Sequence, residues 1–338
     1  MSFTGSSAAH GSAPAGMTAR GGFVGWVAAP LLSALLFLSL LYVPVLGSLL
    51  NPFAPLPIIY YAFTHGTLAG AAAVLASACV IGLLTGPKLG VLYFFSYGLA
   101  GLMMANMIRN GKTFSATTLA TAAAAMAATA LLAVADQGNV AGLYAAMLAS
   151  VKGMMAETIA IYEKAGMPAD QIALLKENSD AISLWAVRSI PGAMTVLYLA
   201  AMFMNYAAYA TLQSRWNWLP AAAPLELNRW SPPEKMVFLF ILGGALMLAP
   251  GDAAHAAGVN LLIITIALYF MTGLCVIQFW FDRGGLPRFL RWTIYILIGF
   301  QPFMIAGTAG LGLFDLWLDF RKIRRAKGEK EDTNGSDT

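Results

Sequence analysis

Apolar stretches long enough to cross a bilayer recur from the beginning of the chain to its end. Hydrophobic residues make up 59% of the 338 residues and charged residues only 11%, whereas soluble domains contain about 25% charged residues. A membrane helix needs about 20 consecutive apolar residues, and the run without charge between Arg20 and Lys88 is far longer than that. The sequence therefore predicts an all-α, polytopic transmembrane helical bundle with about eight or nine membrane segments.

Three closely spaced prolines lie in the part of this run between Asn51 and Gly66: Pro52, Pro55 and Pro57. Proline removes a backbone donor and breaks helices, and irregular backbone at membrane depth is tolerated only where protein buries it or water reaches it. We therefore predict one short broken helix near residues 52–64, with a loop through the prolines and helix from about residue 58. The other helices are expected to pack around this segment, which is expected to carry part of a small-molecule site.

The longest interruption of the apolar pattern is at residues 136–181. Apolar residues at helical spacing, with charges on the other side, predict an extramembrane insert with an amphipathic helix near residues 140–178, lying on the interface or capping the bundle. Gly166-Met-Pro168 is expected to break it, before a short helix of about residues 170–177. Residues 21–320 are read as one transmembrane domain, between a disordered N-terminal tail (1–20) and a basic, then polar, C-terminal tail (321–338).

Basic residues indicate the orientation, because short basic loops prefer the cytoplasm. They gather at residues 109–112, 215–235, 283–291 and 321–327. All four groups reach one side if the proline segment crosses the bilayer and the last apolar stretch is a re-entrant hairpin broken at Gln301-Pro302. Alternatively, the proline segment does not cross and the earlier loops change sides. A cytoplasmic C-terminus is favoured in either case.

The order of these features resembles the YybS-like family of predicted bacterial membrane proteins (domain of unknown function 2232). The resemblance covers about residues 20–325. It includes the proline-rich second helix and the insert before the span with Arg188 and Pro191. It also includes two sequence segments, Trp230-Ser-Pro-Pro-Glu-Lys-Met-Val and Gly312-Leu-Phe-Asp-Leu-Trp-Leu-Asp-Phe-Arg-Lys322. It implies a multi-pass protein of the bacterial inner (cytoplasmic) membrane.

This family is similar in its first half to the S subunits of energy-coupling factor transporters. The similarity implies six helices around a small solute, and docking through small residues to a membrane coupling subunit that works with ATP-binding subunits. Ala29 and Ser33, four residues apart, are candidates for that contact.

Polar side chains within or beside apolar stretches are the candidate solute ligands. Arg188 within a span is a functional-site hypothesis, because burying its charge is costly; alternatively it reaches the interface beside Trp185 or pairs with Asp180. His65 is a candidate hydrogen-bond donor or acceptor inside a cavity; alternatively it caps a short helix or faces the lipid headgroups. The predicted substrate-binding residues are Asn51, Tyr60, Tyr61, His65, Arg188, Asn205 and Tyr209. Structural hydrogen bonding across helices is the favoured alternative for Asn205, and interface anchoring is the alternative for Tyr60 and Tyr61.

The C-terminal basic residues are candidates for contact with a partner or with anionic lipid. These are Arg321, Lys322, Arg324 and Arg325. Asp319 is expected to pair with Lys322 three residues later, on a helix that leaves the membrane.

Motifs for hydrolysis, metal binding or phosphate binding are absent from the sequence: there is no HExxH, no cysteine cluster and no phosphate-cradling glycine loop. The sequence thus predicts no enzyme, no metal and no cofactor. Nucleic acid is not an expected partner either, because the basic residues lie at the ends of apolar stretches. Two functions remain: a solute-binding transport component in the lipid bilayer, or a non-transport membrane scaffold or cell-envelope assembly factor.

Overall fold

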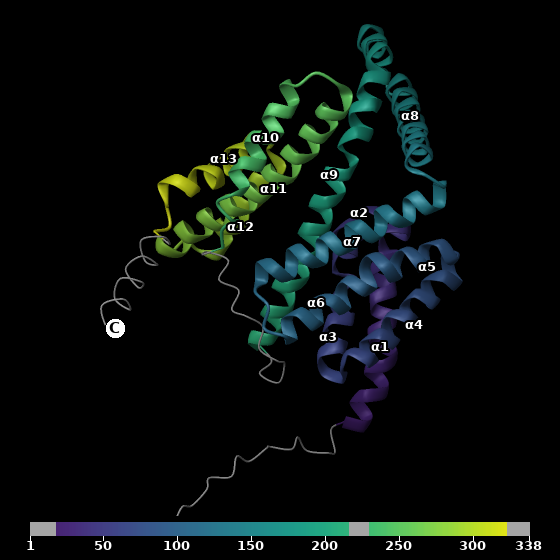
Figure 1. Ribbon diagram of the computed structural model, residues 1–338, viewed down its shortest axis with the longest axis vertical. Helices are drawn as coiled ribbons and strands as arrows, with labels where there is room; N and C mark the ends of the chain where they lie inside the picture. Colours follow the sequence, from purple (N-terminus) through teal and green to yellow (C-terminus); the bar gives the residue numbers. More distant parts are fainter. Residues whose placement is uncertain (1–17, 216–229, 323–338) are drawn as a thin grey trace, which may run out of the picture. The chain divides into compact units, whose positions relative to one another are not determined.

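The computed structural model describes residues 18–215 and 230–322, and this part of the chain is helical with no strand (Figure 1). The predicted all-α class is confirmed. The elements are α1 (Thr18–Tyr42), α2 (Pro44–Leu50), the 3₁₀ turn η1 (Asn51–Phe53), α3 (Leu56–His65), α4 (Thr67–Thr85), α5 (Pro87–Tyr93), the π-helical segment η2 (Phe94–Gly98), α6 (Leu99–Arg109), α7 (Phe114–Gln137), α8 (Val140–Lys164), α9 (Ala169–Arg215), α10 (Met236–Leu248), α11 (Asp252–Arg283), α12 (Arg288–Phe300) and α13 (Pro302–Leu318).

Six stretches of the described chain are helical, long and apolar enough to cross a bilayer. They are Pro44–His65, Thr67–Thr85, Pro87–Arg109, Phe114–Gln137, Ala169–Gln213 and Asp252–Arg283. The number rises to seven if α12 and α13, which meet at a bend of 105°, form one span, and two shorter apolar helices lie at Trp26–Tyr42 and Met236–Leu248. The predicted count of eight or nine is therefore approximate.

The chain divides into two compact units. The first combines residues 1–129 with residues 201–223, and thus contains α1 to α6, most of α7 and the last part of α9. Its centre is the proline segment, where Ala54, Ile58 and Ile59 are fully buried. Helices α1, α4 and α6 pack against α3, which confirms the prediction that helices surround this segment.

The prolines lie in η1, in the turn at residues 54–55 that leads into α3, and in the first turn of α3, so the predicted short broken helix is confirmed, with tight turns in place of an open loop. Each proline-containing turn begins with proline at its first or second position, both in η1 and in α3. Proline is tolerated there because the first backbone N–H groups of a helix have no partner within it. A further break comes at Gly66, whose φ of 96° separates α3 from α4 and favours glycine.

The second unit combines residues 130–200 with residues 224–338. In it α8 and the first half of α9 are joined by ion pairs between Lys152 and Asp180 (2.8 Å) and between Lys176 and Glu163 (2.7 Å). The predicted break at Gly166-Met-Pro168 is confirmed, since α8 ends at Lys164 and α9 begins at Ala169. A separate helix at residues 170–177 was wrong: α9 continues for 47 residues, past Pro191.

Helix α11 packs against both α10 and α13 in the same unit. Glycine is needed where α13 meets α11, because a Cβ added at Gly312 would overlap the backbone of Tyr269, and one added at Gly273 would overlap the backbone of Thr308. Small residues allow such close backbone approach between membrane helices. The break predicted at Gln301-Pro302 is confirmed as the bend between α12 and α13.

Candidate functional site

Side chains from other helices supply the hydrogen bonds that the prolines remove. In a 3₁₀ step the donor to a carbonyl is the N–H three residues later, and Pro55 and Pro57 have no N–H. The carbonyl of Pro52 instead accepts from Asn205 Nδ2 at 2.7 Å. The carbonyl of Ala54 accepts from Ser33 Oγ at 2.5 Å. Asn205 and Ser33 therefore complete the backbone of the proline segment.

Asn51 lies in the same buried network. Its Nδ2 donates to the carbonyl of Phe37 at 2.9 Å, and its Oδ1 accepts from the hydroxyl of Tyr97 at 2.9 Å. The Tyr93 hydroxyl shares a short hydrogen bond with Ser33. Both tyrosines pack edge-on against Phe37, with ring centroids 5.3 Å apart. Tyr93 is the last residue of α5, and Tyr97 lies in the π-helical segment Phe94–Gly98 that follows it.

The aromatic residues of α3 lie at its C-terminal half. Tyr61 is buried and stacks on the exposed ring of His65 at 4.3 Å, while His65 Nδ1 is hydrogen-bonded to the neighbouring Thr64 hydroxyl at 2.7 Å. Tyr60 is half-buried. Tyr209 of α9 is fully buried and stacks on Phe63 at 4.6 Å.

Arg109 was not predicted for this cluster, although it ends α6 beside these rings. It donates to the carbonyl of Ala62 (2.5 Å) and to Thr67 Oγ1 (2.9 Å), and its guanidinium lies 5.6 Å from the centre of the Phe63 ring. An arginine near the C-terminal end of a helix can satisfy the last carbonyls of that helix. Arg109 does this for α3, although it belongs to α6. Arg109 thereby joins the end of α3 to the start of α4.

Six of the seven predicted substrate-binding residues thus belong to the first unit, and Arg188 belongs to the second. Asn51 and Asn205 make hydrogen bonds that support the fold. Of the small residues expected to contact a partner, Ala29 is 8% exposed and Ser33 is fully buried, so Ser33 has an internal role instead. Arg324 and Arg325 lie outside the described residues.

Arg188 pairs with Asp252 at 2.9 Å, whereas Asp180, the partner considered from the sequence, pairs with Lys152. The side chain of Asn260 on α11 bridges two backbone groups of α9 near Arg188. Gly192 N–H donates to Asn260 Oδ1 at 2.5 Å, and Asn260 Nδ2 donates to the Arg188 carbonyl at 2.6 Å. Sequence reasoning missed Asn260, although an asparagine within an apolar stretch is a signal for interhelical hydrogen bonding.

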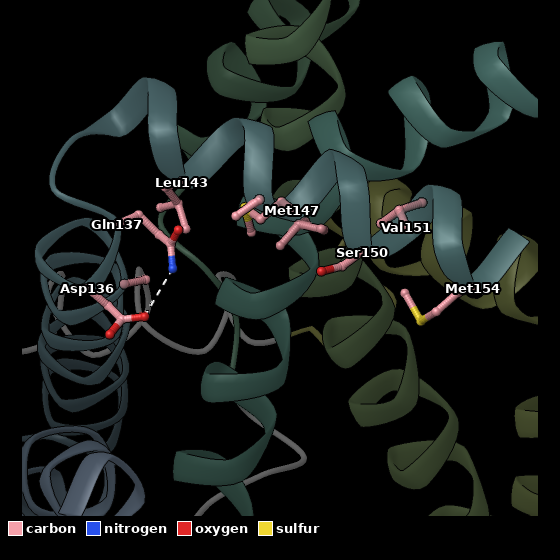
Figure 2. A pocket seen from close by; sticks show the side chains of 10 residues that line it. Asp136, Gln137, Leu143, Met147, Ser150, Val151 and Met154 are labelled. Atoms are coloured by element: carbon pink, nitrogen blue, oxygen red, sulfur yellow. Dashed lines mark hydrogen bonds between the residues drawn. The ribbon is translucent and has the colours of Figure 1, made fainter.

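A groove lies between the end of α7, one face of α8, and Ile190 of α9 (Figure 2). Its volume is about 370 Å³. Asp136 and Gln137 form its polar end, where Gln137 Nε2 donates to Asp136 Oδ2 at 3.0 Å. The α8 side is mainly apolar and includes Leu143, Met147, Val151 and Met154, with Ser150 among them. The sequence predicted these residues as the apolar face of an amphipathic helix, but it did not predict that they line a groove.

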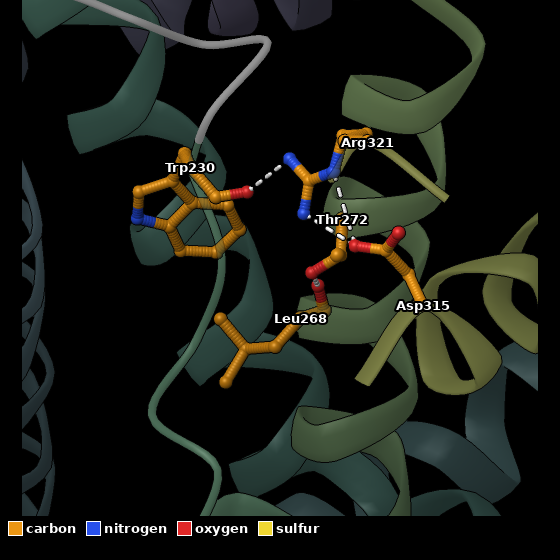
Figure 3. Close-up of polar contacts among 5 residues, drawn as sticks. All are labelled: Trp230, Leu268, Thr272, Asp315 and Arg321. Atoms are coloured by element: carbon orange, nitrogen blue, oxygen red, sulfur yellow. Dashed lines mark hydrogen bonds and ion pairs between the residues drawn. The ribbon is translucent and has the colours of Figure 1, made fainter. Parts of the chain in front are cut away.

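The C-terminal end of α13 is held by a buried ion pair (Figure 3). Arg321 Nη2 and Nε lie 2.6 and 3.0 Å from Asp315 Oδ2, and Arg321 Nη1 donates to the carbonyl of Trp230 at 2.7 Å. Arg321 is only 4% exposed, so it is not available for the lipid or partner contact predicted for it. The predicted helix through Asp319 and Lys322 is also wrong, because α13 ends at Leu318 and Asp319 is left-handed (φ 43°).

Metal ligands do not gather in the described part of the chain: no group of three or more His, Cys, Asp or Glu side chains there could hold a metal ion.

Lys322 is the remaining described basic residue of the predicted contact with a partner or lipid, and it is exposed.

Comparison with known proteins identifies a family. No curated protein and no solved structure matches the chain, so the similarity to energy-coupling factor S subunits stays a prediction. A family model described as "Predicted membrane protein (DUF2232)" matches residues 31–316. This range covers most of the chain and agrees with the resemblance to the YybS-like family. The chain therefore belongs to the family of predicted membrane proteins with domain of unknown function 2232.

Proposed function

We propose that this chain is a solute-binding component of a membrane transport system, and that the groove between α7, α8 and α9 receives the solute. The single observation that carries the proposal is the groove itself. Its volume of about 370 Å³ falls within the ~300–1,000 Å³ that small-molecule sites occupy. Largely apolar walls with a few polar groups at one end are also typical of such sites.

The length of α9 supports a groove that is open to water. Its 47 residues span roughly 70 Å at about 1.5 Å per residue, whereas the hydrocarbon core of a bilayer is about 30 Å thick. A large part of α9 must therefore extend beyond the membrane, and the two ion pairs join α8 to this part. The groove begins at Asp136, where the apolar helix α7 ends, so a solute would reach it from the aqueous side.

We propose that the α8 region lies outside the cytoplasm. Residues 136–181 contain six acidic and three basic residues, while basic residues cluster in the links at 109–112 and 283–291. Basic links prefer the cytoplasm. The contacts of Arg109 with Ala62 and Thr67 support one common side for the link after α6 and the junction of α3 with α4.

We also propose that α12 and α13 form a re-entrant hairpin. With 13 and 17 residues they are roughly 20 and 26 Å long, and each is shorter than the bilayer core. Both ends of the pair contact the last turns of α11: Arg291 of α12 donates to the carbonyl of Phe281 at 3.0 Å, and Phe320, just after α13, lies 6.0 Å from the Trp280 ring. On this proposal the C-terminus shares the cytoplasmic side with the basic link before α12.

Single cysteines in a background without Cys79 and Cys275 test this topology. A membrane-impermeant maleimide on intact spheroplasts should label Ala160→Cys in α8 and Ala253→Cys at the start of α11. Pro287→Cys and Ser336→Cys should react only after permeabilisation. Labelling of Ser336→Cys in intact spheroplasts, with Pro287→Cys protected, would mean that α12 and α13 together cross the membrane.

Solute binding is tested by thermal stabilisation of the purified full-length protein with a broad panel of vitamins and other small molecules. A bulky residue at Ala146, which lines the groove, should abolish stabilisation by any hit. The matched control Ala145→Trp, on the neighbouring exposed position, should retain it. The proposal fails if no compound stabilises the protein, or if Ala146→Trp responds as the unsubstituted protein does.

A second candidate, a membrane scaffold or cell-envelope assembly factor, is favoured by a different observation. Asn51, Asn205 and Ser33 are occupied by hydrogen bonds inside the first unit, as expected if that unit has only a structural role. Affinity purification in mild detergent should then recover a stable membrane or envelope partner. Recovery of a membrane coupling subunit with ATP-binding subunits would favour transport instead.

A further inference from the structure

We infer that the junction of α3, α4 and α6 binds the headgroup of an anionic phospholipid, and that Arg109 and Lys112 are the residues that hold its phosphate. The junction belongs to the first unit, whereas the groove proposed for the solute belongs to the second. The inference therefore goes beyond the proposed function and does not depend on it.

The charge of the first unit is the first argument. Residues 1–129 and 201–223, which form this unit, contain no aspartate and no glutamate, and their basic residues are Arg20, Lys88, Arg109, Lys112 and Arg215. No carboxylate side chain of its own unit can therefore neutralise Arg109. Its contacts are with a carbonyl, a hydroxyl and an aromatic ring. A surface with this uncompensated charge is complementary to an anion.

The geometry of Arg109 is the second argument. Its bonds to the Thr67 hydroxyl and the Ala62 carbonyl, together with the Phe63 ring 5.6 Å from the guanidinium carbon, hold the guanidinium in one place. A guanidinium has five N–H donors, and these two hydrogen bonds leave three of them. Because Arg109 is exposed, the remaining donors can reach a ligand. Arginine binds phosphate oxygens with pairs of such donors.

Lys112 adds a second positive charge at the same end of α6. Its backbone N–H donates to the carbonyl of Met107 at 3.0 Å, and Gly111 before it has a φ of 65°, so the chain turns tightly where α6 ends. The Lys112 side chain is exposed and makes no hydrogen bond or ion pair with the residues that the structure describes. A lysine ammonium is a flexible point charge, and at this position it can reach an anion that Arg109 holds.

The depth of the junction in the membrane distinguishes a lipid from a free phosphate. Four of the stretches that are long and apolar enough to cross a bilayer begin or end there, at His65, Thr67, Arg109 and Phe114. The ends of such helices lie at the level of the lipid headgroups. Leu68, directly after Thr67, is 87% exposed and offers apolar surface to acyl chains. A basic site at this depth fits an anionic headgroup with its chains attached.

Native mass spectrometry of the full-length protein in a neutral detergent measures the binding with three probes. Phosphatidylglycerol carries a net negative charge, phosphatidylcholine carries a phosphate balanced by an ammonium group, and glycerol 3-phosphate is a soluble phosphate ester without acyl chains. We expect phosphatidylglycerol to bind most tightly and glycerol 3-phosphate not to displace it. Lys112→Gln should weaken phosphatidylglycerol binding by about fivefold, the factor for one basic residue at an anionic surface.

Three further variants complete the experiment. Arg109→Gln should weaken binding at least as much as Lys112→Gln, and Arg109→Lys, which keeps the charge but loses the paired donors, should have an intermediate effect. Lys164→Gln, at an exposed lysine that ends α8 in the second unit, is the matched control and should bind as the unsubstituted protein does.

The Lys112 variant decides the outcome, because this side chain supports no described contact of the fold. An affinity for phosphatidylglycerol that Lys112→Gln leaves unchanged overturns the inference, whatever Arg109→Gln does. Equal binding of phosphatidylglycerol and phosphatidylcholine, or an equal loss in Lys164→Gln, also overturns it, since either result would mean that the charge of this junction is not what the lipid recognises. Displacement of the lipid by glycerol 3-phosphate would assign the site to a soluble phosphate ester instead.

Discussion

The side chain of Asn260 replaces a main-chain hydrogen bond beside Gly192. In a regular helix the Gly192 N–H would donate to the Arg188 carbonyl four residues earlier. Here the amide of Asn260 lies between the two, accepting from the first and donating to the second. Pro191 cannot donate a backbone hydrogen bond, and glycine at 192 leaves room for the amide, since a Cβ there would lie 2.8 Å from Asn260 Oδ1.

Replacing Asn260 should therefore destabilise the second unit. Asn260→Leu leaves the Gly192 N–H and the Arg188 carbonyl without this bridge, and an unsatisfied buried polar group costs about 1–3 kcal/mol. Reversible unfolding in mixed micelles of increasing sodium dodecyl sulfate content measures the loss. Asn178→Leu, an exposed position on α9, is the control and should change stability by less than about 0.5 kcal/mol. Equal effects at both positions would argue against the bridge.

The proline segment should depend on its two side-chain donors. Ser33→Ala and Asn205→Leu each remove the donor to one carbonyl, at Ala54 and at Pro52 respectively. We expect each to lower the free energy of unfolding by about 1–3 kcal/mol. Ser48→Ala, which removes only an exposed local hydrogen bond, is the matched control. Thermal unfolding of Ser33→Ala at the same temperature as Ser48→Ala would contradict the prediction.

Two glycines on α13 should respond oppositely to a methyl group. Gly312→Ala pushes a Cβ into the backbone of α11, and overpacking of this kind costs about 1–3 kcal/mol. Gly310→Ala meets nothing within 4 Å, and alanine is the better helix former by about 1 kcal/mol. The melting temperature should fall for Gly312→Ala and stay level or rise for Gly310→Ala. A fall of the same size in both would show that the contact between α11 and α13 is not as close as described.

The ion pair of Asp315 and Arg321 should be costly to break from one side. Arg321→Gln leaves a buried carboxylate without its counter-charge, and such a change costs about 3–5 kcal/mol. The double variant Asp315→Leu/Arg321→Met removes both charges and should regain much of that loss. Lys322→Gln, at the adjacent exposed residue, controls for general effects at this end of the chain. Chemical unfolding of the unsubstituted protein, Asp315→Leu, Arg321→Met and the double variant completes a double-mutant cycle, and simple additivity would contradict the pairing.

Helices whose limits depend on local composition could be predicted from the sequence. The apolar stretches Thr67–Thr85 and Met236–Leu248 form α4 and α10. Their limits coincide with glycine, proline and charged residues, and their length and apolarity suffice to identify membrane helices. The bend at Gln301-Pro302 was predictable for the same reason, since proline acts on its own backbone.

The partners of the polar side chains depended on the tertiary structure. The donor to Pro52 lies 153 residues away in Asn205, Arg188 pairs with Asp252 in place of Asp180, and the groove needs three helices together. Hydropathy alone thus determined that this chain is a helical membrane protein, because transfer into a bilayer depends on the composition of each segment. Only the tertiary structure decided which side chains bond to the backbone carbonyls of the proline segment, and which side chains line the groove. A hydrogen bond or a cavity wall requires atoms from distant segments to meet within a few ångströms.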